Sequence, residues 1–471
     1  MRTAIWYTGA VTAARETATP SPRRGAKLVL GPLRRVRYLR RLRRGSVAPH
    51  LPPPDEAELL QQIERLLAHA DTGSQRGEAT LVAAAYVELD RRGRERFLRA
   101  VAQGFGFDHQ AVDAAAEAWR SAEGHVERIA AADALRRAAT PAYTRLLHLF
   151  TGLESGVKLL VDLRAELRTL DLDEPDLATL DHELARFLGI LFNVGLLDLR
   201  RISWDSPAAL LEKLTTYEAV HAIASWTDLK NRLASDRRCY AFFHPAMPDE
   251  PLVFVEIALT QGMASHLAPL LDEDAPLLDV DTATAATFYS ITNCQPGLAG
   301  VNMGTELLEA VVERLSHELP SLTTYATLSP IPGFRAWAEE IIANDDLLPR
   351  ERALLSPVGH LRELLADEAW AKSVEASALL EPGLTRLCAR YLATVRPDGR
   401  VLDPVGNFHL SNGAAIERVN WLANASPSGM AASYGLMVNY RYDPQRIASR
   451  AAAYATDRTL AVGDGVRDLL R

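Results

Sequence analysis

The chain has 471 residues, of which 48% are hydrophobic, 24% charged and 7% aromatic; this is typical of a folded protein with about two or three domains and excludes a disordered or collagen-like chain. The net charge of −8 is unevenly distributed, because residues 1–54 carry twelve Arg or Lys and one acid, which gives this leader +11 and the other residues −19. An acidic body argues against a nucleic-acid-binding protein, which needs a basic face to meet phosphates.

The basic leader, residues 1–54, has ten Arg or Lys between Arg23 and Arg44 and closes on three prolines, Pro52 to Pro54. Such a segment is compatible with an organellar transit peptide, with a basic surface helix or with a flexible extension, and we favour the extension. It lacks the apolar core of a secretory signal. We therefore expect a cytoplasmic protein, or a mitochondrial one if the leader is a transit peptide.

Residues 55–205 have the pattern of an all-α domain. Leu59, Leu60, Ile63, Leu66 and Leu67 lie on one helical stripe, which is the spacing of a helix with one buried face. Helices are also predicted at residues 81–89, 94–102, 143–153, 157–170 and 177–192. The absence of an internal repeat favours a bundle over a solenoid.

From residue 206 the pattern becomes mixed. Helices are predicted at residues 207–216 and 227–233, and Ser225 caps the second of them. Apolar runs at 239–243 and 252–259 then flank a Pro/Asp turn, which indicates a hairpin. Strands are then predicted at 286–292 and 323–328, with a Gly-rich loop and a helix at 305–319 between them. Strand, helix, strand is a βαβ unit, so these two strands should be parallel and carry chemistry at their carboxyl ends.

Three segments contain residues suited to a functional site. The loop from Gln295 to Gly304 joins a strand to a helix, where free N–H groups and the helix dipole can hold a phosphate, although a tight turn is the simpler explanation. Ser329 follows the next strand and is either a turn cap or a site residue. It lacks a G-x-S-x-G elbow, which argues against a hydrolase nucleophile. His409 lies between Phe408 and Leu410, as either a proton donor or a core histidine, before a predicted helix at 415–422.

Metal and membrane sites are not indicated by the sequence. The histidines have no partners at metal-ligand spacing, and the three cysteines, Cys239, Cys294 and Cys388, form no CxxC pair. Neither a zinc ribbon nor a disulfide framework is therefore expected, and a reducing compartment is indicated. No run of 18 apolar residues occurs, so no membrane-spanning helix is expected.

Several further motifs accompany these segments, and the full set is Arg238-Cys239-Tyr240, Glu250 to Val253, Phe288 to Ile291, Gln295 to Gly304, Leu328 to Phe334, Pro404 to Ala414, Gly435 to Met437 and Asn439 to Tyr442. Taken together, these motifs resemble the malonyl-CoA decarboxylase family over residues 55–445, most strongly from residue 200 onward. The motifs SPIPGF and NFHLxNGA, in this order after a CoA-type loop, are specific.

The resemblance implies an α + α/β architecture, in which an all-α oligomerisation domain (55–205) precedes a GNAT-like, acetyltransferase-type α/β catalytic domain (206–471). It implies a carboxy-lyase of fatty acid or malonate metabolism that converts malonyl-CoA to acetyl-CoA and carbon dioxide, forms homo-oligomers and needs no metal or organic cofactor. The Ser-Lys-Leu peroxisomal address of some relatives is missing at the C-terminus.

The family's functional residues map onto matching positions of this sequence. The active serine corresponds to Ser329, the active histidine to His409 and a supporting tyrosine to Tyr442. Asn302 replaces the Glu of some relatives, which removes a carboxylate but leaves the backbone of the loop. The acyl-CoA loop of the family corresponds to Ala299, Gly300, Val301, Asn302, Met303, Gly304 and Thr305.

These assignments lead to a hypothesis for the mechanism. Loss of carbon dioxide leaves an enolate, which His409 would protonate while Ser329 contacts the carboxylate or relays a proton and Tyr442 orients the pair. Two other functions stay open: an acyl-CoA N-acyltransferase, which needs an amine acceptor, and an acyl-CoA sensor without turnover. The sequence leaves open whether a methylmalonyl thioester is preferred.

Overall fold

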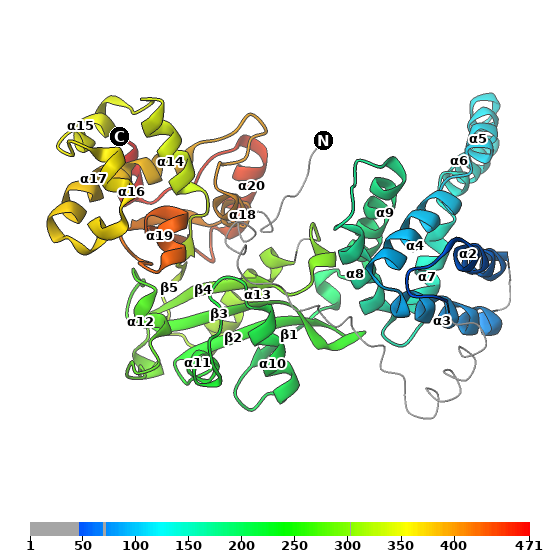
Figure 1. The fold of residues 1–471 in the computed structure, drawn as a ribbon, viewed down its shortest axis with the longest axis horizontal. Helices are drawn as coiled ribbons and strands as arrows, with labels where there is room; N and C mark the ends of the chain where they lie inside the picture. The colour runs from blue at the N-terminus through cyan, green and yellow to red at the C-terminus, as the bar shows by residue number, and fades with distance from the viewer. Residues whose placement is uncertain (1–46, 69–71, 302) are drawn as a thin grey trace.

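The computed structural model describes residues 47–68, 72–301 and 303–471. The expectations for leader residues 1–46 and for Asn302 lie outside these residues. The chain forms a helical region followed by an α/β region built on a mixed sheet (Figure 1). The predicted order, an all-α domain followed by an α/β domain, is confirmed.

The helical region buries its leucine-rich stripes in one core. Leu59, Ile63 and Leu66 are buried there, as predicted from their spacing, and Leu60 and Leu67 are partly buried. The helices are α2 (Pro53–Ala68), α3 (Thr72–Glu88), α4 (Arg91–Gly104), α5 (His109–Ser121), α6 (His125–Ala138), α7 (Tyr143–Thr151), α8 (Gly156–Leu167) and α9 (Pro175–Leu191).

The start of the helical region differs from the predicted boundary at residue 55. Helix α2 begins at Pro53 and Leu51 is fully buried against the core. Proline suits the first turn of a helix because its missing N–H is not needed there. Residues 51–54 therefore belong to the helical region rather than to a linker.

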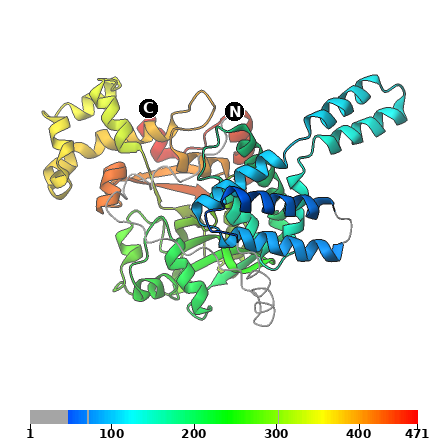
Figure 2. The ribbon, with the colours of Figure 1, turned by 45° about the vertical axis from the view of Figure 1, so that its right-hand side comes forward.

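Helices α5 and α6 form a hairpin that projects from the rest of the molecule (Figure 2). Neither helix has a buried residue. Trp119, Val126 and Ile129 are exposed on it. This hairpin thus presents apolar side chains away from the core of the chain.

The sheet has eight strands in the described part of the chain, in the order β1-β2-β3-β4-β5-β8-β6, and β7 also pairs with β8. The predicted hairpin is confirmed as the antiparallel pair β2–β3. Strand β1 pairs with β2, so the sheet begins before residue 206, the predicted start of the catalytic domain. The strands are β1 (Asp198–Ile202), β2 (Arg237–His244), β3 (Met247–Thr260), β4 (Ala285–Asn293), β5 (Thr324–Thr327), β6 (Ser329–Pro330), β7 (Ala415–Asn420) and β8 (Met437–Tyr442).

The predicted βαβ unit is confirmed: β4 and β5 are parallel neighbours joined through helix α13 (Gly304–Glu318). Their pairing ends at Phe288 and Thr327. Strand β4 continues to Asn293, whereas the chain after β5 turns to pair with β8. The two parallel strands therefore separate at their carboxyl ends, where ligands of such units bind.

Helices cover the sheet and form a further cluster towards the C-terminus (Figure 1). The predicted helices at 207–216 and 227–233 are confirmed as α10 and α11, and Ser225 caps α11 by accepting from the Asp228 N–H. The remaining helices are α10 (Ala208–Tyr217), α11 (Trp226–Arg232), α12 (Ala268–Leu271), α14 (Phe334–Ala343), α15 (Pro349–Leu355), α16 (Leu361–Ala366), α17 (Val374–Ala393), α18 (Pro404–Ser411), α19 (Pro427–Ser433), α20 (Ile447–Asp457) and α21 (Asp464–Leu470), with short 3-10 turns η1 (Val194–Leu196), η2 (Val280–Thr282), η3 (Pro296–Leu298) and η4 (Glu368–Lys372).

The helix predicted at residues 415–422 is wrong. Residues Ala415–Asn420 form strand β7, which pairs with β8 along its length. Ala, Glu and Arg favour a helix in isolation, but pairing with a buried neighbouring strand overrides this weak preference. The helix in this part of the chain is α18, Pro404–Ser411, which precedes β7 and contains His409.

Candidate active site

Ser329, His409 and Tyr442 meet in one buried cluster. The Ser329 Oγ lies 3.2 Å from Nε2 of His409, and the Tyr442 hydroxyl lies 2.7 Å from Nδ1 of the same ring. Each residue comes from a different element: Ser329 begins β6, His409 lies on α18 and Tyr442 ends β8. The structure thus brings together the three residues that the sequence singled out for chemistry.

Thr327 sets the direction of the hydrogen bonds in this cluster. The Ser329 hydroxyl donates to Thr327 Oγ1 over 2.8 Å, and the Tyr440 N–H donates to the same oxygen over 3.1 Å. Since the serine proton is engaged with Thr327, Ser329 Oγ is free to accept from Nε2–H of His409. The Tyr442 hydroxyl then donates to Nδ1, which selects the Nε2–H tautomer.

Tyr440 and Asp403 hold the imidazole ring in place. The Tyr440 ring stacks on the His409 ring, with centroids 4.5 Å apart and planes inclined by 24°. The Tyr440 hydroxyl lies 3.4 Å from Oδ2 of Asp403. The same carboxyl oxygen caps α18 by accepting from the Gly406 N–H over 2.6 Å. The helix cap and the stacked ring therefore fix the orientation of His409.

Burial dominates the electrostatics of the cluster. Burial lowers the pKa of His409 to about 3, so the ring is neutral at pH 7. Burial likewise raises the pKa of Asp403 to about 7 against the opposing effect of the Gly406 N–H, and raises the pKa of the Tyr442 hydroxyl. Because the cluster is buried and its hydrogen-bonded groups are neutral, a charge that develops beside it interacts strongly with these donors and acceptors.

The predicted acyl-CoA loop lies between β4 and α13. It begins with Gln295, whose side-chain amide donates to Pro251 O, and passes through the short turn η3, Pro296–Leu298. Gly300 has a φ of +85°, a conformation that glycine adopts without strain. Val301 and Met303 lead into α13, which begins at Gly304 and includes Thr305. The loop is thus followed directly by a helix N-terminus with its positive dipole end.

Helix α13 links the loop to the buried cluster. Burial is the main cause of the raised pKa of the Tyr442 hydroxyl, and the negative charge of Glu309, in the second turn of α13, raises it further. Leu328, the residue before Ser329, donates its N–H to Phe288 O of β4. The loop and the cluster therefore occupy the carboxyl ends of the neighbouring strands β4 and β5.

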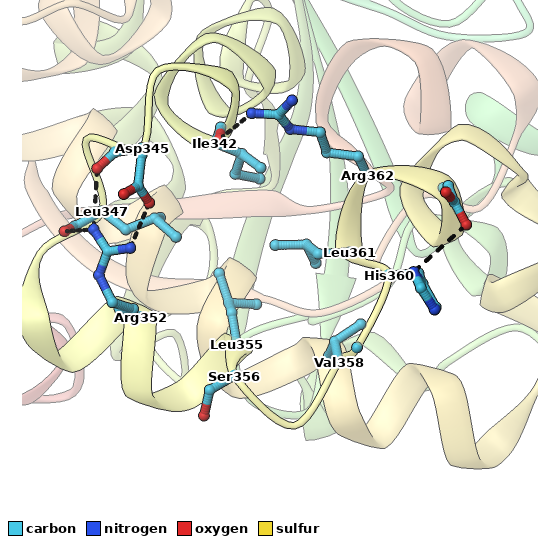
Figure 3. Close-up of a pocket in the computed structure, with 12 residues that line it drawn as sticks. Ile342, Asp345, Leu347, Arg352, Leu355, Ser356, Val358, His360, Leu361 and Arg362 are labelled. Carbon is cyan, nitrogen blue, oxygen red and sulfur yellow. Dashed lines mark hydrogen bonds and ion pairs between the residues drawn. The ribbon is translucent and has the colours of Figure 1, made fainter.

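A separate hollow of about 510 Å³ lies on α14, α15 and α16 (Figure 3). Its guanidinium groups already bind the protein: Arg362 donates to Ile342 O and Ala343 O, and Arg352 binds Asp345. None of the predicted site residues lines it. We therefore place the candidate active site at the Ser329 cluster and not in this hollow.

Metal-binding clusters and membrane-spanning helices are both absent from the described part of the chain. Within residues 47–68, 72–301 and 303–471, no three His, Cys, Asp or Glu side chains gather in a way that could hold a metal ion. Over the same part of the chain, every helix is too short or too polar to span a bilayer.

The fold and the buried cluster define an α/β enzyme, and comparison with known proteins identifies its family. Models of the malonyl-CoA decarboxylase C-terminal and N-terminal domains match residues 195–471 and 105–192. The chain is 36% identical over 397 residues to "Malonyl-CoA decarboxylase, mitochondrial" of Anser anser anser, covering 79% of each chain. It is 36% identical over 401 residues to the protein of that name from Rattus norvegicus, covering 80% of this chain and 82% of the other.

Solved structures agree with these matches. The malonyl-CoA decarboxylase of Agrobacterium vitis aligns with a TM-score of 0.81 and 37% identity over 88% of this chain and 100% of the other. That of Rhodopseudomonas palustris aligns with a TM-score of 0.80 and 38% identity over 88% of this chain and 99% of the other. The chain therefore belongs to the malonyl-CoA decarboxylase family, and it is a carboxy-lyase.

Sequence reasoning missed Thr327, Tyr440 and Asp403 as parts of the site. The period of two in β8 places Tyr440 and Tyr442 on the same face, which is a readable signal. Asp403 followed by Pro404 and Gly406 is a helix-start signal. Thr327 lies only two residues before Ser329, but its contact with the Tyr440 N–H, 113 positions away, has no signal in the sequence.

Proposed function

We propose that this member of the malonyl-CoA decarboxylase family converts malonyl-CoA to acetyl-CoA and carbon dioxide at the Ser329–His409–Tyr442 cluster. The observation that carries the proposal is the hydrogen-bonded chain from Tyr442 through His409 and Ser329 to Thr327. Ser329 follows the carboxyl end of β5, and the neighbouring parallel strand β4 is followed by the loop that leads into α13.

Residues 299–305 are assigned to binding the CoA part of the substrate. The N–H groups of Ala299, Val301 and Met303 donate within the loop. The Gly300 N–H, which has no partner among the described residues, and the positive end of the α13 dipole favour a phosphate group at this position. The protein outside the leader is acidic, so local amides rather than a broad positive field must attract the anionic thioester. Binding at the loop would direct the acyl group towards the cluster between the separating strands.

The chemistry at the cluster is the cleavage of one C–C bond. The bond between the α-carbon and the malonyl carboxylate breaks, its electron pair forms the enolate of the acetyl thioester, and carbon dioxide leaves. The α-carbon then takes one proton to give acetyl-CoA. Hydrogen-bond donors near the thioester oxygen stabilise the enolate most, because its charge develops there.

His409 is assigned as the source of the proton. Its pKa of about 3 makes the ring neutral before substrate binds. A malonyl carboxylate, and then an enolate, next to the ring favours the charged imidazolium. We expect His409 to become protonated when the substrate binds and to deliver this proton to the α-carbon. Ser329 would contact the carboxylate or relay the proton, and Tyr442 would fix the orientation of the imidazole ring.

The reaction is proposed to need no metal and no organic prosthetic group. The cluster consists of hydroxyl, imidazole and phenol groups, which hold and move protons without a Lewis acid. Dialysis of the enzyme against a strong chelator tests this proposal. Acetyl-CoA formation should continue at the original rate, and a loss of activity that Zn²⁺ or Mg²⁺ restores would refute it.

Incubation with malonyl-CoA alone distinguishes the decarboxylase from an N-acyltransferase. A decarboxylase releases acetyl-CoA and carbon dioxide in equal amounts without an acceptor, whereas an acyltransferase requires an amine. A sensor would bind malonyl-CoA and release neither product. The same assay with methylmalonyl-CoA measures whether the site admits a branched acyl group.

Self-association through the helical domain is proposed on the basis of the α5–α6 hairpin. Its exposed Trp119, Val126 and Ile129 form an apolar surface with no cover from the described part of the same chain. Light scattering after size exclusion should give the mass of an oligomer. Replacing Trp119 and Ile129 by Glu should lower that mass, whereas Val374→Glu, at an exposed position on α17, should leave it unchanged.

The cellular location is proposed to be the cytoplasm, with mitochondrial import by the Arg-rich leader as the alternative. The Anser and Rattus relatives are named as mitochondrial proteins, whereas the solved relatives are from bacteria. Removal of residues 1–46 tests the leader. An unchanged location of the shortened chain favours the cytoplasmic assignment, and a loss of mitochondrial import favours the alternative.

A further inference from the structure

Helix α8 of the helical domain contacts the acyl-CoA loop backbone to backbone. A Cβ atom on Gly297 would lie 1.8 Å from the carbonyl oxygen of Val161, which is too close for any side chain. Figure 1 shows α8 on the side of the helical region that faces the sheet. Only glycine at position 297 allows the loop to approach the helix this closely.

Arg164 fastens the loop at this contact. Its side chain is 3% exposed, and its Nη1 donates to the carbonyl oxygens of Gly297 and Ala299 over 2.7 and 2.8 Å. Its Nε donates to Asp181 of α9 over 2.9 Å. A buried guanidinium is costly unless it is paired and hydrogen-bonded, and here the carboxylate supplies the pairing while the loop supplies the acceptors.

The bond to Ala299 fixes the direction of the next amide. In a planar trans peptide the C=O and the N–H point in opposite directions. Because the Ala299 carbonyl is directed at Arg164, the Gly300 N–H points away from α8. Within the described residues this N–H has no hydrogen-bond partner, and the positive φ of Gly300 turns the chain towards α13.

We propose that Arg164 is a positioning residue for substrate binding: from the helical domain, it holds the acyl-CoA loop so that the Gly300 N–H is presented to the phosphates of CoA. This inference rests on the proposed function of residues 299–305 as the CoA site. Arg164 touches neither substrate nor reacting atoms. It acts through the loop backbone, and thereby makes CoA binding depend on the docking of the helical domain against the sheet.

The test compares substitutions on the two sides of the contact with a matched control. Arg164→Lys keeps the charge but loses the fork that reaches Asp181 and both carbonyls, and Gly297→Ala pushes the loop away from α8. Arg168→Ala is the control, because Arg168 binds the same Asp181 at 3.5 Å but makes no bond to the loop. KM and kcat for malonyl-CoA, CoA binding by calorimetry and the melting temperature are measured for each.

Arg164→Lys and Gly297→Ala should raise KM and weaken CoA binding by ~10–100-fold, with kcat within about threefold of the original because the reacting groups are untouched. Arg168→Ala should leave KM unchanged. A lower melting temperature with unchanged KM and CoA affinity would show that Arg164 is only structural and would overturn the proposal.

A further variant separates this inference from the loop assignment on which it rests. Gly300→Val strains the positive φ of the loop and should also raise KM. If Gly300→Val raises KM but Arg164→Lys does not, the role of Arg164 is wrong and the CoA loop stands. If Gly300→Val leaves KM and CoA affinity unchanged, residues 299–305 are not the CoA site and both proposals fail.

Discussion

Nε2 of His409 lies 3.2 Å from the Oγ of Ser329, although 80 residues separate the two in the chain. The contact arises because β6 and α18 are both held against β8: β6 pairs with it directly, and the Tyr440 ring of β8 stacks on His409. A long-range contact of two groups able to exchange a proton, in a buried setting, is the basis of the proposed mechanism.

Ser329→Ala removes the hydroxyl that faces the imidazole. If Ser329 contacts the malonyl carboxylate or relays the proton, kcat/KM for malonyl-CoA should fall by ~10²-fold. The melting temperature should change little, since alanine fits the space of serine. Steady-state kinetics on malonyl-CoA measure the effect, and a kcat/KM within about twofold of the original would remove Ser329 from the mechanism.

Tyr442→Phe removes the hydroxyl that binds Nδ1 and leaves the ring packing intact. The imidazole then loses the partner that selects its tautomer, so kcat should fall by ~10-fold while KM stays close to the original. Kinetics of this variant should be compared with those of Tyr454→Phe, whose hydroxyl bonds Val401 and Asn407 outside the cluster. Equal effects of the two variants would argue against a role for Tyr442 in orienting His409.

Thr327→Val keeps the shape of the side chain but removes the acceptor of Ser329 and of the Tyr440 N–H. An unpaired buried N–H costs about 1–3 kcal/mol, so the free energy of unfolding should fall by that amount, and kcat should fall as well. Thr327→Ser retains the hydroxyl and should lose less of both. Denaturant unfolding with activity assays checks this, and equal stability and kcat in the two variants would contradict it.

Acid should destabilise the protein through His409. Its pKa is lowered from 6.5 to about 3, so below pH 6.5 the unfolded chain binds a proton that the folded chain does not, and stability falls as pH drops towards 3. In the chain with His409→Gln this contribution is missing. Between pH 7.5 and pH 5 the original protein should therefore lose about 2 kcal/mol more unfolding free energy than the variant.

Asp403 changes the stability with pH in the opposite direction to His409. The original protein must therefore be compared with the His409→Gln variant. Its pKa is raised from 3.8 to about 7, so the folded state binds the extra proton and stability falls as pH rises between these values. Both chains contain Asp403, so its effect cancels in the difference between them. Parallel losses of stability with acid in both chains would show that His409 titrates normally.

The sequence predicted the elements that local pattern controls. The hairpin β2–β3 followed from two apolar runs around a turn, and the parallel pair β4–β5 from strand, loop and helix in succession. Residues 415–420 have the local pattern of a helix but form a strand, because their pairing with β8 lies outside any local window.

The site residues divide in the same way. Ser329, His409 and Tyr442 could be named from motifs that resemble a family. Thr327 and Arg164 could not, since the contact of Thr327 with the Tyr440 N–H and the contact of Arg164 with the loop carbonyls join residues that are distant in the chain. Local periodicity contains no information on such contacts.

The most direct test of the central claim is the rate of acetyl-CoA release from malonyl-CoA alone by the chain with His409→Ala. We predict that kcat falls by ~10²–10⁴-fold, while CoA binding by calorimetry and the cooperative unfolding transition are retained. Near-normal turnover in this folded, CoA-binding variant would show that His409 does not supply the proton and would contradict the proposed mechanism.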